Sequence, residues 1–263
     1  MESRNPVFAR TEAMAAGGRT ATAGVDAASI EQLEQAYSGP SAGPLQTQRM
    51  TYNDVIMKTG MTFAVLLVGA GIGWFNPALA MIGFIVGLVL GLVNAFKKEP
   101  SPALIMTYAA FMGVGLGGIS FFFQAQWQGI VQQAVLGTLA VFGVALFAYR
   151  SGRIRVTPKF QRMVLIGMMG YLAFSLVNVL VMVFGSGDNA FGLRSGWLGI
   201  AAGLIGVALA AFSLVLDFDF IDKGVANGIP VKYAWTAAFG LVVTLVWLYL
   251  ELLRLIAIFS GQD

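Results

Sequence analysis

The chain has 263 residues, of which 57% are hydrophobic and 11% charged, and its formal net charge is +3. Soluble domains carry about 25% charged residues, so this composition excludes an ordinary soluble protein and indicates a membrane protein. The sequence contains no cysteine and no histidine, which excludes disulfides, iron–sulfur clusters, thiolate zinc sites and histidine-based catalysis. Any pH sensing must therefore rest on carboxylates.

The first 50 residues differ in composition from the rest of the chain. They are rich in Ala, Gly, Ser and Thr and hold few large apolar side chains. Such a segment buries too little apolar surface to fold, and it lacks the order of charged and apolar regions that marks a signal peptide. We predict a disordered cytoplasmic tail over residues 1–50 and a seven-helix transmembrane domain over residues 51–263.

Long runs without a charged residue follow this tail. Residues 59–96 and 100–149 are each long enough for two spans of about 20 residues, and three later runs give one span each. Asn, Gly and Pro, which favour turns, separate the spans. The sequence therefore predicts an all-α polytopic membrane protein with seven transmembrane helices, at residues 55–75, 77–96, 102–123, 129–149, 162–184, 197–219 and 233–258.

Lys and Arg are distributed unequally between the two ends of these spans, and cytoplasmic loops carry the excess. With the N-terminus inside, only Arg194 and Arg254 lie on the outer side. The inner segments hold Arg49, Lys58, Lys97, Lys98, Arg150, Arg153, Arg155, Lys159, Arg162, Lys223 and Lys232. We predict a multi-pass protein of the inner (plasma) membrane with an outer C-terminus. The bilayer is the expected partner, and this loop bias does not indicate nucleic-acid binding.

Glycine patterns indicate helix packing rather than a cofactor site. GVGLGG at residues 113–118 fits the dinucleotide-binding pattern, but that fingerprint needs a strand before it and a helix after it. Here it lies inside an apolar run, and no phosphate-binding loop or activated nucleophile occurs, so we expect no cofactor and no enzyme. Four-residue glycine spacings within residues 83–91, 113–117 and 199–203 predict close packing of helices.

Three aspartates close the sixth expected span, in SLVLDFDFID at residues 213–222. Ionisable residues inside a membrane are costly and mark functional sites. Counting from Trp197 at about 1.5 Å per residue places Asp217 near the inner boundary of the hydrocarbon, with Asp219 and Asp222 further toward water. We interpret Asp217 as functional and Asp222 as an ordinary interfacial charge.

The seventh expected span holds Glu251 and Arg254 in LYLELLRL. At i and i+3 on one helix they can pair with each other. Two interpretations stay open: a self-neutralised pair near the outer face, or a carboxylate on a cation path with Arg254 as its gate or counter-ion. Arg254 is the only membrane-embedded arginine that the sequence indicates.

The seven compact spans, LDFDFID closing the sixth and VWLYLELLRL on the seventh resemble the Bax inhibitor, YccA-like family over about residues 50–259. RNPVF and MTYNDVIMKTG resemble its actinobacterial-type branch. The resemblance implies a central seventh helix and two carboxylates that share a proton and control a calcium leak. By motif, Asp217 in LDF and Glu251 in LYLE match these carboxylates. Relatives carry an arginine latch on the second span, where this chain has no arginine.

We therefore expect a pH-sensitive, calcium-permeable leak channel. Asp217 and Glu251 are the expected titrating carboxylates, Asp219 an accessory cation attractor and Arg254 a gate. Asp217 and Asp219 are also the candidate metal ligands, because hard cations prefer carboxylate oxygens, with Ca²⁺ as the permeant ion rather than a cofactor. The alternative is a non-conducting regulator that binds membrane proteases or quality-control proteins through the tail and the basic inner loop. Neither interpretation specifies an oligomeric state.

Overall fold

A computed structural model of the chain describes residues 49–184 and 192–261. Seven helices in these ranges are long and apolar enough to cross a membrane. They are α4 (Tyr52–Phe75), α5 (Ala80–Phe96), α6 (Pro102–Gln126), α7 (Ile130–Arg150), α8 (Pro158–Phe184), α9 (Gly196–Ala226) and α10 (Ala234–Ser260), with the short 3-10 helices η1 (Pro77–Leu79), η2 (Gly192–Arg194) and η3 (Val231–Tyr233) between them. The predicted all-α, seven-span architecture is confirmed. The expected tail lies outside the described residues except for Arg49 and Met50.

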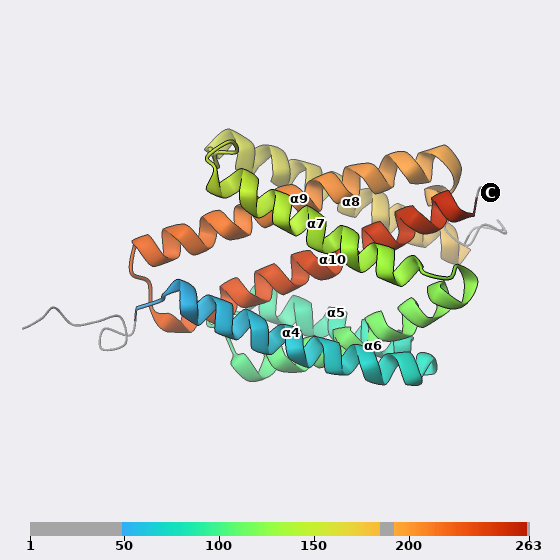
Figure 1. Cartoon of the computed structure of the whole chain (residues 1–263), viewed down its shortest axis with the longest axis horizontal. Coiled ribbons are helices and arrows are strands. Elements are labelled where there is room, and N and C mark those ends of the chain that lie inside the picture. The colour runs from blue at the N-terminus through green and yellow to red at the C-terminus, as the bar shows by residue number, and fades with distance from the viewer. Residues whose placement is uncertain (1–48, 185–191, 262–263) are drawn as a thin grey trace, which may run out of the picture. The chain divides into compact units, whose positions relative to one another are not determined.

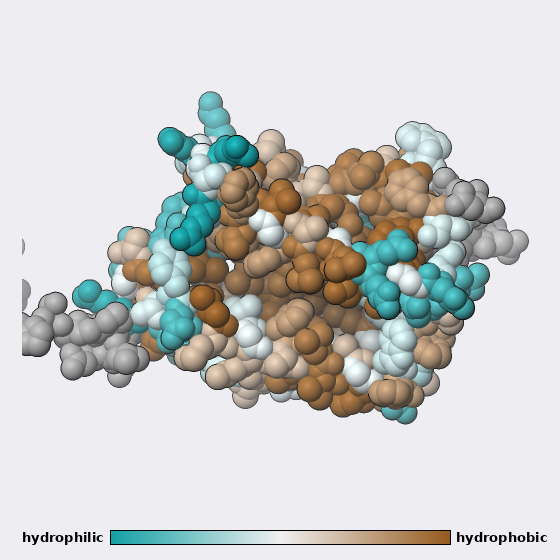
Figure 2. Space-filling view, viewed as in Figure 1, coloured by the Kyte–Doolittle hydropathy of each residue, from teal (hydrophilic) through white to brown (hydrophobic). Residues whose placement is uncertain are grey.

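Short connections make successive helices antiparallel, so the bundle has two ends. Helices α4, α6, α8 and α10 begin at the end that carries most of the Lys and Arg residues, which we call the basic end. We call the opposite end the far end. Figure 2 shows apolar surface over the middle of one face and polar surface toward both ends. Many large apolar side chains are exposed there, as expected where helices contact bilayer hydrocarbon.

Helix α10 is the central helix of the bundle. It packs against α4, α6, α7 and α9, and Figure 1 shows it running between α4–α6 and α7–α9. Its buried residues extend along almost the whole helix, from Ala234 to Ile258. The predicted central position of the seventh helix is confirmed, and the polar side chains of Thr244 and Glu251 on α10 are buried in the interior of the protein.

Glycine allows α6 to approach α4 closely. A Cβ atom at Gly117 would overlap the carbonyl oxygen of Ala70, and one at Gly113 would overlap that of Leu66. Gly83 of α5 meets the backbone of α6 in the same way. Lipid supplies no hydrophobic force between helices, so such close van der Waals packing stabilises the bundle. The glycine spacings are therefore used for packing within the chain.

Helix α9 ends later than the sequence indicated, at Ala226 instead of residue 219. The turn to α10 comes at Gly228, whose φ of +61° lies in the left-handed region that favours glycine. The Met50 N–H donates to the Ile229 carbonyl oxygen at 2.7 Å, which holds the start of α4 against this turn. All three aspartates of the sixth span consequently lie on helical turns with defined directions.

Candidate functional site

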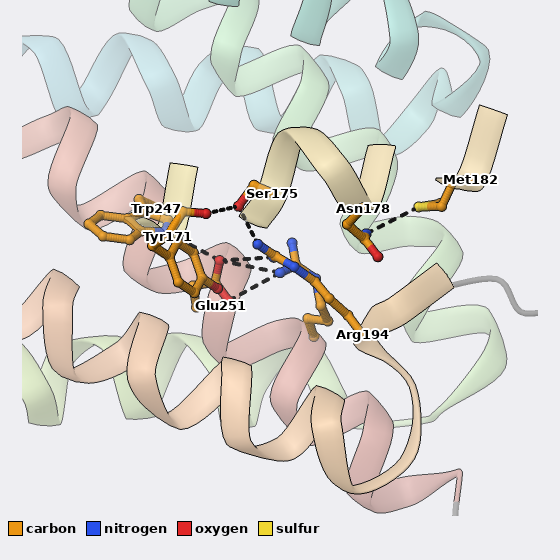
Figure 3. A network of polar contacts seen from close by, with 8 residues as sticks. Tyr171, Ser175, Asn178, Met182, Arg194, Trp247 and Glu251 are labelled. Atoms are coloured by element: carbon orange, nitrogen blue, oxygen red, sulfur yellow. Dashed lines mark hydrogen bonds and ion pairs between the residues drawn. The ribbon is translucent and has the colours of Figure 1, made fainter. Parts of the chain in front are cut away.

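A buried ion-pair network lies toward the far end of α10, centred on Glu251, which is 3% exposed. The Glu251 carboxylate accepts hydrogen bonds from Arg254 Nη1 at 3.1 and 3.2 Å and from Trp247 Nε1 at 3.2 Å. Arg194 Nη1 lies 3.5 Å from Glu251 Oε1. Figure 3 shows the guanidinium group of Arg194 beside the Glu251 carboxylate. With two positive charges and one negative, the described network carries a net charge of +1.

Arg194 reaches this network from η2 and is 5% exposed. Its guanidinium lies over the rings of Tyr171 and Phe174, at 4.8 and 5.3 Å from the ring centroids. It also donates a hydrogen bond to Ser175 Oγ. These three partners belong to α8, so Arg194 joins α8 to α10. A planar guanidinium suits this combination of stacking and hydrogen bonding.

The position of Arg194 depends on how η2 packs against α8. The Leu193 N–H donates to Asn178 Oδ1 at 2.7 Å, and Asn178 Nδ2 donates to Met182 Sδ at 3.5 Å. Gly192 has a φ of +57°, and a Cβ atom there would lie 2.8 Å from Asn178 Oδ1. Glycine therefore permits both the backbone conformation and the close approach that direct Arg194 inward.

Asp217 makes a separate contact with α10. Thr244 Oγ1 donates to Asp217 Oδ2 at 2.7 Å, and a Cβ atom at Gly240 would lie 3.2 Å from Asp217 Oδ1. Thr244 precedes Glu251 by seven residues, or about 10 Å of helix. The structure therefore places both carboxylates along α10, two turns apart, and does not bring them into contact as a pair that shares one proton.

Asp219 points to a different side of α9 from Asp217. Asp219 Oδ2 accepts a hydrogen bond from Lys223 Nζ at 2.6 Å, and its side chain lines a cavity of about 1040 Å³ at the basic end. Within residues 49–184 and 192–261, no group of three Asp or Glu side chains converges as metal ligands do. The two candidate metal ligands are thus placed apart, each with its own hydrogen-bond donor.

Asp222 has a structural role that sequence reasoning missed. Tyr52 Oη of α4 and Tyr149 Oη of α7 both donate to its carboxylate, the second at 2.9 Å. Asp222 therefore joins three helices and lines the same basic-end cavity as Asp219. The interpretation of Asp222 as an ordinary interfacial charge is corrected. The available signal was the tyrosine at the basic end of each partner helix, because tyrosine favours the membrane–water interface.

A second cavity, of about 820 Å³, lies beside the Glu251 network. Its walls come from α8 and α10, with Leu88 of α5. Glu251, Arg194 and Arg254 line it together with Ser175, and most of the remaining lining is apolar. The network is therefore next to an open space rather than closed off by packed side chains.

Arg194 is the member of this network that sequence reasoning missed. The sequence predicts Arg194 on the outer side and Arg254 as the only membrane-embedded arginine, yet the side chain of Arg194 is 7% exposed and that of Arg254 is 26% exposed. The predicted pairing of Glu251 with Arg254 is found, but a second arginine shares the carboxylate, so the pair is not self-neutralised. The signal that could have indicated this was an isolated arginine in GLRSG, on the outer side, where the sequence has few other basic residues.

Comparison with known proteins agrees with this architecture. A family model described as Bax inhibitor 1 like matches residues 5–261, which extends beyond the region of about 50–259 in which the sequence motifs lie. None of the curated proteins compared with the chain matches it. Because the family match covers well over half of the chain, this multi-pass membrane protein belongs to the Bax inhibitor 1 like family.

Proposed function

We propose that this protein is a pH-sensitive, calcium-permeable leak channel of the inner membrane, with its N-terminus in the cytoplasm. The observation that carries the proposal is the buried Glu251 network, where a single carboxylate holds two guanidinium groups. One proton on Glu251 removes the only negative charge of this network within the described residues. Membership of the Bax inhibitor 1 like family is consistent with a membrane role of this kind.

The proposed latch is the ion pair between Glu251 and Arg194. In the closed state it ties α10 to η2 and, through Ser175, to α8. Proton uptake by Glu251 leaves Arg194 as a buried charge without its counter-charge, which costs several kcal/mol. Arg194 then gains by moving toward water and taking η2 with it. The latch therefore opens as the pH falls.

Asp217 is the proposed cation site between the two cavities. Leu241 lines the cavity at the basic end and Val243 lines the second cavity, while the next residue, Thr244, donates to Asp217. Asp219 lines the basic-end cavity as a cation attractor. Carboxylate and hydroxyl oxygens are hard ligands of the kind that Ca²⁺ prefers.

The test is calcium flux into proteoliposomes between about pH 5 and pH 8, the range in which buried carboxylates can titrate. Wild type is expected to conduct more at low pH. Glu251→Gln imitates the protonated latch and should conduct at every pH, without a midpoint. Asp217→Asn should lower the flux at every pH and keep the midpoint. Glu99→Gln makes the same chemical change as Glu251→Gln at an exposed residue and should match wild type.

Other outcomes separate the alternatives. A pH profile of Glu251→Gln that matches wild type would show that Glu251 does not gate the protein, and an unchanged flux in Asp217→Asn would show that Asp217 is not a cation site. Absence of calcium flux from wild type at every pH would favour the non-conducting regulator. In that case, deletion of residues 1–48 should abolish the binding of a membrane protease, whereas a channel should keep its flux after the same deletion.

A further inference from the structure

The second cavity forms a groove along α8 that is open to the bilayer. Leu165, Met169, Leu172 and Val179 line it, and each of these side chains is more than half exposed. Helix α8 packs mainly against α9 and η2, so its remaining surface faces lipid. The volume of about 820 Å³ lies within the range of roughly 300–1,000 Å³ of small-molecule sites.

Positive charge gathers at one end of this groove. Arg194, Arg254 and Glu251 all line it, and their charges sum to +1. Arg194 is 5% exposed, and its Nε atom has no hydrogen-bond acceptor among the residues that the structure describes. A buried N–H group without an acceptor is costly and rare. The net positive charge calls for an anionic oxygen, and the described residues leave the hydrogen bonding of Arg194 incomplete.

The rest of the groove has the opposite character. Along α8, Leu165 lies ten residues before Ser175, or about 15 Å. The α8 residues that line the groove between these positions are Met168, Met169, Tyr171 and Leu172. The groove is therefore charged near Ser175 and mainly apolar from there toward the basic end of α8, which is the polarity of a single lipid chain with an anionic head.

We propose that this groove binds an anionic amphiphile taken from the bilayer. Its carboxylate or phosphate lies against Arg194 and Arg254, and its acyl chain extends along α8 toward Leu165. Guanidinium groups bind both kinds of oxyanion through paired, charge-assisted hydrogen bonds. Lateral entry is available because the α8 wall of the groove is exposed. This inference does not depend on whether the protein conducts calcium.

Trp247 provides a probe for the test because it lines the groove and donates to Glu251. The full chain is reconstituted in phosphatidylcholine vesicles and titrated with dibrominated stearate, whose bromine atoms quench nearby tryptophan fluorescence. Subtracting the signal of Trp247→Phe isolates this position. We expect saturable quenching by the acid and only unsaturable, collisional quenching by its uncharged methyl ester. Dibrominated phosphatidylglycerol forms a second arm of the titration.

Two variants test the two halves of the groove. Arg194→Gln should raise the ligand concentration at half-saturation by about tenfold or more, because a charge-assisted hydrogen bond is lost. Arg194→Lys should restore part of the lost affinity. Val179→Phe narrows the groove beside the arginines without changing any charge and should also weaken binding. It keeps the test decisive if Arg194→Gln does not fold. Arg150→Gln, in the basic-end cavity, should bind as wild type does.

The outcomes are distinct. Saturation by dibrominated stearate supports an acyl carboxylate as the ligand, and saturation by dibrominated phosphatidylglycerol supports a lipid phosphate. The proposal is wrong if neither saturates, if the methyl ester quenches as the acid does, or if Arg194→Gln and Val179→Phe both bind like wild type. Calcium flux is measured separately, so its absence bears on the channel proposal alone.

Discussion

Glu251 and Asp222 are carboxylates that both hold helices together, but they do so with different partners. Glu251 is 3% exposed and is held by two guanidinium groups. Asp222 lies at the basic end, is partly exposed and is held by two tyrosine hydroxyl groups. Water helps to solvate a charge at the membrane boundary, whereas a charge deep among apolar side chains is costly to bury without an opposite charge. For Glu251 and Asp222, the kind of partner thus follows their depth in the bundle.

The largest loss of stability is expected from a substitution at Glu251. Glu251→Gln leaves Arg194 buried without a counter-charge and should lower the free energy of unfolding by about 3–5 kcal/mol. Adding Arg194→Gln should recover much of that loss, because the only charge of the network then left without the carboxylate is Arg254, whose side chain is 26% exposed. The free energies of unfolding of the two single variants and the double variant, measured in detergent micelles, give the coupling energy between Glu251 and Arg194. Purely additive losses would mean that the two side chains do not interact.

A smaller effect is expected at Asp222. Tyr149→Phe removes one of its two hydrogen-bond donors and should cost about 0.5–1.5 kcal/mol of unfolding free energy, since water can replace the lost hydroxyl group. Tyr52→Phe should behave similarly, and the double variant should lose more than either alone. Unfolding under the same conditions checks this. A loss from Tyr149→Phe as large as that from Glu251→Gln would overturn the dependence on depth.

The smallest effect is expected at the exposed pair of Glu99 and Lys232, whose nitrogen and oxygen atoms are 2.7 Å apart. The hydrogen bond from Lys232 lowers the pKa of Glu99 below its ordinary value. Any stabilisation is therefore present above the ordinary carboxyl pKa and is lost as the pH falls through the lowered value. Exposed ion pairs contribute little to stability, so Glu99→Gln should leave the free energy of unfolding unchanged between about pH 5 and pH 8. A clear pH-dependent loss of unfolding free energy in this variant would contradict the prediction.

The ends of the helices show where sequence reasoning was limited. Seven spans were predictable because the hydrocarbon thickness requires about 20 apolar residues for each. The end of α9 was not, because LDFDFIDKG reads as a polar boundary, yet Asp219 and Lys223 pair one turn apart and support a helix that continues to Ala226. Local charge marked the membrane boundary and not the end of the helix.

The candidate site shows the same limit at longer range. Glu251 and Arg254 lie one turn apart on α10, so their pairing was predictable from spacing. Arg194 is 57 positions before Glu251 and reaches it only because Gly192 and Asn178 hold η2 against α8. The contact of Asp217 with Thr244 likewise depends on how α9 and α10 align. Spacing along one helix could not specify either contact.

The sequence by itself determined the number of spans, the family and the residues that cost most to bury, because these follow from hydropathy, charge and local motifs. Tertiary structure alone decided that α10 places Glu251 between two arginines, that Asp217 and Glu251 stay two turns apart, and that Asp222 joins three helices. The physical reason is that a charge inside a membrane must find partners in space, and packing between helices determines which partners are within reach.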